Sequence, residues 1–298
     1  MNITKMKVTN IAIIGMGLIG GSIGMALKNA SKFKYRIIGI GNNSDTLRQA
    51  VLVGAADCVT TDFAKGVSEA DIIFICTPVL QIVPVVKKIL PFLKAGAILT
   101  DAGSTKGYVA KQITGILPSN ICYVAGHPMA GREQSGIMAA DKDLFRNKWY
   151  IVIPEVSTSP RAVEAVCQII KDTGARITAM DVVSHDRCAA IISHIPHIAA
   201  AAMVNLLDAY PNPEDSLKLA GGGFRDTTRI ASSNADMWAD ICLTNADSIT
   251  NGLENLRSIL DQVINSIKEG DRQALYAYFH AAKTRRDALI TASGVNSQ

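Results

Sequence analysis

The sequence predicts a doubly wound α/β domain with a parallel sheet, followed by an all-α domain. Through the first half of the chain, apolar strand-like runs alternate with helical segments, a pattern typical of βαβ units. The runs are apolar throughout rather than at every second residue, which predicts a sheet covered on both faces. After residue 181 the strand-like runs stop and long helical patterns follow. We therefore expect one domain over residues 8–180 and a second over residues 181–298.

The elements of the first domain follow from these runs and from the glycine, proline and polar residues that bound them. Most of the expected helices lie between two strands, as the crossover connections of a parallel sheet require. Strands are expected at Ile11–Gly15, Arg36–Ile40, Asp71–Cys76, Ala97–Thr100, Cys122–Ala125, Trp149–Ile153 and Ile177–Met180. Helices are expected at Ser22–Asn29, Asp45–Val53, Val79–Leu90, Lys106–Ile116 and Arg161–Asp172.

The second domain is expected to consist of three long helical stretches, at Ser184–Leu207, Met237–Ile267 and Arg272–Thr291. In the middle stretch, apolar residues recur at spacings close to three, four and seven, which indicates one apolar face. Helices of this length leave an apolar stripe uncovered in a single chain. We therefore expect a homodimer.

Composition excludes several classes of protein. With 48% apolar and 19% charged residues, the chain of 298 residues can bury a sizeable core, which excludes wholesale disorder. A net charge of +4, evenly scattered, gives no indication of nucleic-acid binding. The six cysteines form no C-x-x-C pair, so we expect neither a zinc site nor disulfides. They are interpreted as reduced, mostly buried thiols of a cytoplasmic protein.

Two stretches of 20 residues carry no charge, at Val8–Leu27 and Cys188–Leu207, and a span of that length could cross a bilayer. The first contains five glycines, three of them in a phosphate-binding pattern. The second contains a serine, a proline and two histidines, which are costly in lipid. We interpret both stretches as buried elements of a soluble protein and expect no membrane partner.

Gly15, Gly17 and Gly20 form a G-x-G-x-x-G pattern directly after an expected strand and before a helix. A dinucleotide-binding turn needs this context, because the first glycine allows the tight turn, the second lets the pyrophosphate approach and the third lets the helix pack closely. Free N–H groups at the helix start, where Leu18 and Ile19 lie, favour an anion. A glycine-rich turn without a ligand is the alternative.

The second strand of such a fold normally ends at an acidic residue that bonds the adenosine ribose. Gly41 and Asn42 stand there instead, and the nearest arginine is Arg48. NAD and NADP are therefore both candidate cofactors, with NAD slightly favoured. Thr77 and Pro78 follow the third expected strand, at the carboxyl edge where ligands bind, and join Asn42 as candidates for cofactor binding.

Two further segments place polar side chains at the same edge of the sheet. Ser104 lies in the segment Asp101–Lys106, and His127 lies between a glycine and a proline directly after the fifth expected strand. Ser104 could instead cap the following helix, and His127 could be a loop histidine bonded to the backbone. The place of His127 favours a fixed imidazole that acts as a general base.

Five longer segments occur in the order GMGLIGGSIGMAL, DAGSTKG, GHPMAGREQSG, ISHIPHIAAA and GGGFRDTTRIASSNADMWADI. Through them the chain resembles the prephenate dehydrogenase family, which includes arogenate and cyclohexadienyl dehydrogenases, from Ile11 to Leu289. The third and fifth segments are highly specific. The resemblance implies a Rossmann domain joined to a helical domain that binds substrate and forms a dimer.

The resemblance also implies a reaction, the NAD(P)-dependent oxidative decarboxylation of prephenate to 4-hydroxyphenylpyruvate in tyrosine biosynthesis. Two alternatives stay open: arogenate as the substrate, which gives tyrosine directly, and a non-catalytic dinucleotide-binding sensor. A β-hydroxyacid dehydrogenase or a pyrroline-carboxylate reductase would lack the third and fifth segments. We expect no regulatory or chorismate mutase domain after the last helix.

Roles for single residues follow from the same resemblance. His127 would accept the proton of the substrate's C4 hydroxyl, and Ser104 would bond the same hydroxyl. The family often has lysine at position 225 and an acid at position 41, where this chain differs. Arg229 would bind a substrate carboxylate, Ser193 and His197 would line the substrate pocket, and Glu133 with Arg225 would form a gating ion pair at its mouth.

Three other patterns receive structural interpretations. His194 and His197 are three residues apart, but no third ligand stands at a useful spacing, so no metal is expected. The pair His185–Asp186 is interpreted as the start or cap of a long helix. Trp238 is interpreted as an anchor of the core or of an interface.

Overall fold

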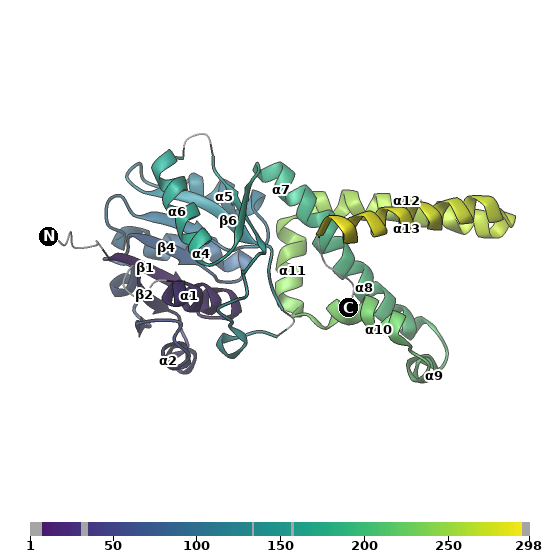
Figure 1. Ribbon diagram of the computed structural model, residues 1–298, viewed down its shortest axis with the longest axis horizontal. Helices are drawn as coiled ribbons and strands as arrows, with labels where there is room; N and C mark the ends of the chain where they lie inside the picture. Colours follow the sequence, from purple (N-terminus) through teal and green to yellow (C-terminus); the bar gives the residue numbers. More distant parts are fainter. Residues whose placement is uncertain (1–7, 31–34, 133, 156–157, 294–298) are drawn as a thin grey trace. The chain divides into compact units, whose positions relative to one another are not determined.

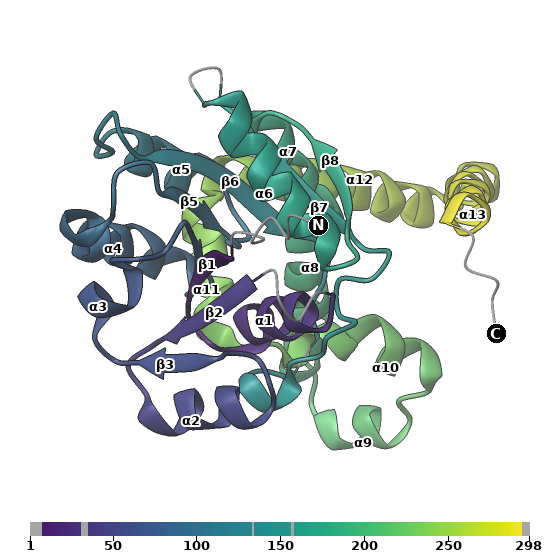
Figure 2. The same cartoon turned by 60° about the vertical axis from the view of Figure 1, so that its left-hand side comes forward.

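The computed structural model describes residues 8–30, 35–132, 134–155 and 158–293 of the chain. Within them, one eight-stranded sheet has the strand order β3-β2-β1-β4-β5-β6-β7-β8 (Figure 1, Figure 2). Chain order reverses between the neighbours β1 and β4, and in such sheets ligands bind at the carboxyl ends of these strands. The strands are β1 (Thr9–Ile14), β2 (Tyr35–Ile40), β3 (Cys58–Thr60), β4 (Ile72–Ile75), β5 (Ile98–Asp101), β6 (Cys122–Pro128), β7 (Trp149–Ile153) and β8 (Arg176–Ala179).

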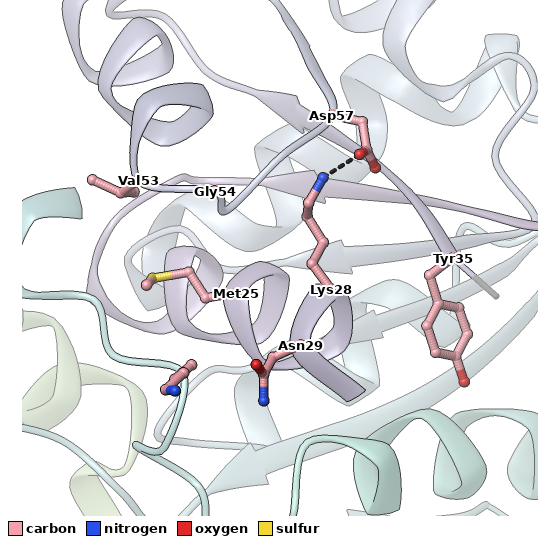
Figure 3. Close-up of a pocket in the computed structure, with 8 residues that line it drawn as sticks. Met25, Lys28, Asn29, Tyr35, Val53, Gly54 and Asp57 are labelled. Carbon is pink, nitrogen blue, oxygen red and sulfur yellow. Dashed lines mark hydrogen bonds and ion pairs between the residues drawn. The ribbon is translucent and has the colours of Figure 1, made fainter. Parts of the chain in front are cut away.

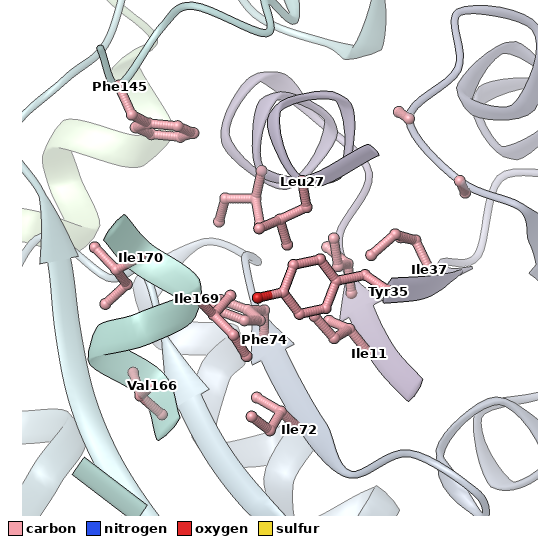
Figure 4. Packing of buried hydrophobic residues seen from close by; sticks show 14 of the residues in the cluster. Ile11, Leu27, Tyr35, Ile37, Ile72, Phe74, Phe145, Val166, Ile169 and Ile170 are labelled. Carbon is pink, nitrogen blue, oxygen red and sulfur yellow. The ribbon is translucent and has the colours of Figure 1, made fainter. Parts of the chain in front are cut away.

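Helices cover both faces of the sheet, as the continuously apolar strands predict. In β1, Ile11 and Ile13 belong to the apolar cluster that α1 and α6 complete (Figure 4), whereas Ala12 and Ile14 belong to the cluster completed by α3, α4 and α5. The doubly wound α/β prediction is thereby confirmed. The helices of this part are α1 (Leu18–Ala30), α2 (Ser44–Leu52), α3 (Phe63–Val67), α4 (Val79–Ile89), α5 (Gly107–Thr114) and α6 (Pro160–Asp172).

Strand β6 is longer than predicted, and this places His127 in the sheet rather than in a loop. β7 pairs with it antiparallel, with His127 opposite Ile151 and Pro128 opposite Tyr150. The prediction ended the strand at Ala125 because a glycine and a proline come close behind it. The hydrogen bonds to β7 keep this backbone extended, and β6–β7 is the antiparallel pair in an otherwise parallel sheet.

After the sheet, the regular elements of the described residues are all helical, as predicted. The expected helix Met237–Ile267 is interrupted at Asn245, because its side-chain amide turns inward and donates to the carbonyl oxygen of Asp186 at 2.8 Å. α11 packs against α4 and α7 packs against α5. These helices are α7 (Val182–Ala189), α8 (Ile195–Asn205), α9 (Pro213–Lys218), α10 (Gly222–Thr228), α11 (Ala235–Thr244), α12 (Ala246–Glu269) and α13 (Arg272–Ser293), and a π-helical turn (Ala190–His194) joins α7 to α8.

Contacts within the chain define two compact units, residues 1–249 and residues 250–298. The first contains the sheet and the helices through α11. The second contains most of α12 and all of α13, and its helices expose large apolar side chains in the single chain. These side chains are Ile259, Leu260, Ile264, Ile267, Tyr276, Tyr278, Phe279 and Leu289.

The two uncharged stretches differ in burial. Val8–Leu27 forms β1 and the first turns of α1, and most of it is buried as predicted. Val182–Ala209 is long and apolar enough to cross a membrane by length and composition alone, and 17% of its most apolar window is buried. The expectation that Cys188–Leu207 is buried is therefore wrong for the single chain. Ile191 and Ile192 are each more than half exposed.

The cysteines are less buried than predicted. All six are free thiols. Five of them are half-buried, and Cys188 on α7 is exposed. Four of them, Cys58, Cys76, Cys122 and Cys167, pack against the edges of the apolar clusters.

Candidate active site

The glycine-rich turn after β1 is shaped by close backbone contacts. Gly15 has a φ of +95°, and a Cβ atom there would lie 2.6 Å from the carbonyl oxygen of Cys76 at the end of β4. A Cβ on Gly20 would lie 2.1 Å from the carbonyl oxygen of Gly15. At Gly17, by contrast, nothing lies within 4 Å of an added Cβ. The fold itself therefore requires the first and third glycines, while the second borders open space that a phosphate can enter.

The surroundings of this turn fit a dinucleotide. The hydroxyl of Thr77, directly after β4, is buried and has no hydrogen-bond partner among the described residues. Pro78 stands at the N-cap position of α4, and no side chain caps that helix. Asn42 is exposed after β2. A hydroxyl buried without a partner beside an open anion-binding turn is what an incoming polar ligand would satisfy.

A cavity of about 460 Å³ lies between the turn and the helices of the same unit. Four of the predicted catalytic and substrate-binding residues line it: Ser104 from the β5–α5 loop, His127 from β6, and Ser193 and His197 from the π turn and α8. Leu18 and Ile19 of the glycine-rich turn line it as well. Part of the predicted cofactor site and part of the predicted substrate site therefore meet at one cavity.

The predicted arginines are not among the residues that line this cavity. Arg225 on α10 and Arg229 are both exposed. Arg229 begins a short 3-10 turn (Arg229–Ser232), and the next residue, Ile230, does line the cavity. Glu133 lies outside the described residues.

A chain of three buried side chains leads from α7 to the cavity. The Nδ1 atom of His185 lies 2.7 Å from a carboxylate oxygen of Asp186, and its Nε2 atom lies 2.8 Å from Nδ1 of His127. A neutral His185 that donates Nδ1–H to the carboxylate must accept at Nε2. His127 then donates Nδ1–H to it and keeps its own Nε2 unprotonated. The arrangement supplies a proton acceptor at His127, which is the one of these three residues that lines the cavity.

Electrostatics hold His127 in the neutral form. Burial lowers its pKa well below the usual value, and the nearby His185, Lys106 and His194 lower it further. Burial alone would raise the pKa of Asp186, but hydrogen bonds from His185 and from the backbone N–H groups of Gly107 and Lys106 outweigh it and lower the pKa. Asp186 is therefore an ionised acceptor.

This geometry corrects two structural interpretations. Asp181, and not the His185–Asp186 pair, caps α7 by accepting from the N–H of Ser184 at 2.9 Å. Asp186 instead accepts from the N–H groups of Lys106 and Gly107, at 2.8 and 2.7 Å, and so caps α5 from another element. Ser104 therefore does not cap α5.

A buried ion pair lies beside strand β6. The side chains of Lys106 and Asp101 are fully buried and bonded to each other, and the Lys106 ammonium also donates to the carbonyl of Gly126 at 2.7 Å. Tyr123 donates its hydroxyl to the same carboxylate at 2.7 Å. These contacts hold the ends of β5 and β6 together next to His127. They also pair both buried charges, as a buried ion pair requires.

The helical wall of the cavity contains two more histidines and Trp238. His197 donates Nδ1–H to the carbonyl of Ser193 at 2.9 Å and stacks on Trp238, with ring centroids 3.8 Å apart. Asn245 donates to Nδ1 of His194 (3.2 Å). Burial lowers the pKa of His194 to about 4 and also lowers that of His197, although the Ser193 carbonyl opposes the second shift. Trp238 is thus a wall of the site rather than only a packing anchor.

A second cavity, of about 470 Å³, is lined by residues from α1, from the start of β2 and from the loop before β3 (Figure 3). Three charged residues line it, Lys28, Asp57 and Lys142, and the first two are bonded to each other. None of the residues predicted to act on a ligand lines it. The chemistry-bearing groups therefore favour the first cavity as the site. No group of three or more metal-ligating side chains is found in the described part of the chain.

Comparison with known proteins agrees with this geometry. Residues 23–179 match the family model for the prephenate dehydrogenase nucleotide-binding domain, and residues 181–281 match that for the prephenate dehydrogenase dimerization domain. The first match begins inside α1, so the glycine-rich turn rests on its own geometry.

Relatives are similar over nearly the whole chain. A prephenate dehydrogenase of Bacillus subtilis is 39% identical over 96% of this chain and 77% of its own length. The crystal structure of prephenate dehydrogenase from A. aeolicus in complex with hydroxyphenyl propionate and NAD+ is 32% identical, with a TM-score of 0.89 over 95% of this chain and 99% of that one. A Synechocystis arogenate dehydrogenase is 28% identical, with a TM-score of 0.81 over 94% and 100%. The chain belongs to the prephenate dehydrogenase family of oxidoreductases.

Proposed function

We propose that the protein catalyses the NAD-dependent oxidative decarboxylation of prephenate to 4-hydroxyphenylpyruvate, a step of tyrosine biosynthesis. The observation that carries the proposal is the buried Asp186–His185–His127 chain, which ends in the same cavity as Leu18 and Ile19 of the dinucleotide turn. A proton acceptor next to a nicotinamide site is what the oxidation of a ring alcohol requires.

The reaction balances with the groups present. A bound nicotinamide supplies the hydride acceptor for C4 of the substrate. Nε2 of His127 accepts the proton of the C4 hydroxyl as that carbon is oxidised, and the positive charge is stabilised through His185 by Asp186. When the bond from C1 to the carboxylate breaks, its electron pair enters the ring, which becomes aromatic. The proton returns to the C4 oxygen, so prephenate loses one hydride and one CO2.

The other predicted residues have proposed positioning roles. Ser104 bonds the C4 hydroxyl and orients it toward His127, and Ser193 and His197 line the space for the pyruvyl side chain. Arg229 binds a substrate carboxylate from the turn whose next residue lines the cavity. Glu133 and Arg225 form the proposed gate. Gly15, Gly17, Gly20, Thr77, Pro78 and Asn42 hold the cofactor.

NAD is the proposed cofactor in preference to NADP. Arg48, the arginine nearest to the ribose position, is bonded to Asp45 on the same helix. The side chain of Asn43 caps α2, since its Oδ1 accepts from the N–H of Thr46 at 2.9 Å. Neither contact indicates a site built for a 2′-phosphate. The related A. aeolicus enzyme was crystallised with NAD+.

Arogenate is the second candidate substrate, and one observation favours it. Because His197 gives its Nδ1–H to the Ser193 carbonyl, a neutral ring offers only a lone pair at Nε2. A lone pair suits the ammonium of arogenate better than the keto group of prephenate. A non-catalytic sensor is disfavoured, because such a protein has no use for a buried proton acceptor.

A direct assay tests the proposal. Purified protein is mixed with prephenate or arogenate and with NAD+ or NADP+, and formation of the reduced nicotinamide is followed by its absorbance. We expect turnover with prephenate and NAD+. Absence of turnover in all four combinations would sink the enzyme reading, and faster turnover of arogenate would reassign the substrate.

The pH dependence follows from the lowered pKa of His127. The base works only when unprotonated, so activity falls as pH drops through its pKa in the free enzyme. Because that pKa lies well below 6.5, we expect kcat/KM to stay constant as pH falls through 6.5 and to decline only at lower pH. The profile is measured over the range in which circular dichroism shows a folded protein. An acid limb centred at or above 6.5 would contradict this.

Arg229→Ala is expected to raise the KM for prephenate about 10-fold or more with little change in kcat, since a charged hydrogen bond to a carboxylate is present in the ground state. Steady-state kinetics at saturating NAD+ measure the split. Lys218→Ala, which removes an exposed cation on α9, serves as the control and leaves KM unchanged. An intact KM in Arg229→Ala would reassign that arginine.

A homodimer and a cytoplasmic location are part of the proposal. The exposed apolar residues of α12 and α13 and of the stretch Val182–Ala209 need a cover, and a match to a dimerization domain supports a second copy rather than lipid. Light scattering should give twice the mass of the 31.7 kDa chain. A monomeric mass would remove this part of the proposal.

A further inference from the structure

Arg132 is the one formally charged side chain among the described residues that line the 460 Å³ cavity. The histidines around it have lowered pKa values and are neutral at pH 7. The proposed reaction nevertheless brings several negative charges to this place, two on the cofactor's diphosphate and two on the substrate's carboxylates. A lone cation in such a cavity sets which of these anions is held there.

The position of Arg132 is fixed relative to helix α1. Its guanidinium donates to a carboxylate oxygen of Asp141 at 2.5 Å. The backbone N–H of Asp141 in turn donates to the buried hydroxyl of Ser22 on α1 at 2.9 Å. A Cβ on Gly21 would lie 2.5 Å from the side chain of Ile137 and 2.9 Å from that of Ala140, so the residues just before Asp141 lie directly on that helix. Arg132 is therefore held in place against the first turns of α1 through Asp141 and Ser22.

The same turns of α1 form the anion-binding end of the glycine-rich loop. Leu18 and Ile19, whose N–H groups open the helix, line the cavity together with Arg132. The bond to Asp141 involves one guanidinium nitrogen, Nη2, and a guanidinium has five N–H donors. Donors are therefore left that can bind an oxyanion while Asp141 holds the side chain.

We propose that Arg132 is a second anion-binding group of the dinucleotide site, which binds the cofactor's diphosphate across from the N-terminus of α1. This rests on the proposed use of a nicotinamide dinucleotide. Asp141 is a positioning residue that acts through Arg132. An ordinary surface ion pair would contribute little to any ligand's affinity, since both partners are partly exposed, 47% and 31%. The cavity and the anchoring on α1 distinguish this pair from such a contact.

The test measures binding rather than turnover. Titration calorimetry compares ADP-ribose, which carries the diphosphate, with adenosine, which lacks it. We expect Arg132→Ala to weaken ADP-ribose about 10-fold and to leave adenosine unchanged, and Arg132→Lys to retain part of the affinity. Asp141→Asn should give a smaller loss. The matched control is Arg146→Ala, which removes an arginine paired with Asp143 in the same segment but away from the cavity.

The outcomes separate this proposal from the proposed reaction. Unchanged ADP-ribose affinity in Arg132→Ala, with the unfolding temperature of the wild type, overturns it. 4-Hydroxyphenylpropionate, a carboxylate that resembles the product, is titrated as well. A loss of affinity for this ligand alone also overturns the proposal, since it assigns Arg132 to the substrate carboxylate. If the wild type binds ADP-ribose but turns over neither prephenate nor arogenate, the reaction fails while the role of Arg132 is still measured. A wild type that does not bind ADP-ribose contradicts the dinucleotide site itself.

Discussion

His127→Asn is expected to lower kcat for prephenate by about 10²- to 10⁴-fold, with little change in KM, because it removes the proton acceptor and leaves the cavity wall in place. The side chain ends the buried chain from Asp186 and lines the cavity, so its loss acts on the proton and not on substrate capture. Steady-state kinetics at pH 7.5 or thereabouts, where the wild-type base is neutral, measure the effect. An unchanged kcat would take His127 out of the proton step.

Two measurements keep this result interpretable. ADP-ribose binding should be the same in His127→Asn and the wild type, which shows that the cofactor site is intact. His280→Asn, on α13, removes an imidazole that stacks on Tyr276 and does not line the cavity, and its kcat should match the wild type. A common fall in both variants would indicate a structural effect.

Asp186→Asn is expected to lower kcat by about 10²- to 10³-fold through the tautomers of two histidines. An amide N–H facing Nδ1 of His185 would place the His185 proton on Nε2, and His127 would then carry its proton on Nε2, where a lone pair is needed. The same change leaves one N–H group at the start of α5 without an acceptor, which costs about 1–3 kcal/mol of stability. Kinetics and thermal unfolding measure the two effects separately.

A milder variant tests the tautomer argument if Asp186→Asn folds poorly. His185→Gln retains a side-chain acceptor for His127 and leaves the cap of α5 in place, so it should keep more activity than His185→Leu. Asp181→Asn is the matched control, because it alters an exposed carboxylate at the start of α7 that caps this helix and bonds Ser184 rather than either histidine. Equal kcat values for His185→Gln and His185→Leu would remove the relay and leave Asp186 a purely structural role.

The layers of the fold were predictable because apolar runs and glycines report local requirements. Gly15 and Gly20 are required by contacts of 2.6 and 2.1 Å within the same βαβ unit, so their pattern is visible in the sequence. The short β3 and α3 left too few residues for a periodic signal. The break at Asn245 and the extension of β6 depend on partners distant in the chain, the Asp186 carbonyl and strand β7. Such pairing has no signature in the neighbouring residues.

The same distinction applies to the site. His127 and Ser104 follow predicted strands, and their convergence at one edge follows from the topology of parallel sheets. The relay was not predictable, because His185 lies 58 residues beyond His127 and only the packing of α7 on α5 brings them together. The signal that was available, an adjacent histidine and aspartate at the start of a helix, is equally typical of a cap. Arg132 lies in the segment GHPMAGREQSG, which the sequence singles out. Its bond to Asp141, however, forms only because the loop between them passes over α1, and the sequence does not show that path.

Asp186 joins two duties in a single carboxylate, since it accepts from the first N–H groups of α5 and from the histidine that orients the base. A substitution there is penalised twice, once in folding yield and once in turnover. Drift at this position is therefore constrained even in a cell that obtains its aromatic amino acids from the medium, for as long as the chain must still fold. An inactive descendant of this enzyme would be expected to lose its imidazoles first and this acid last.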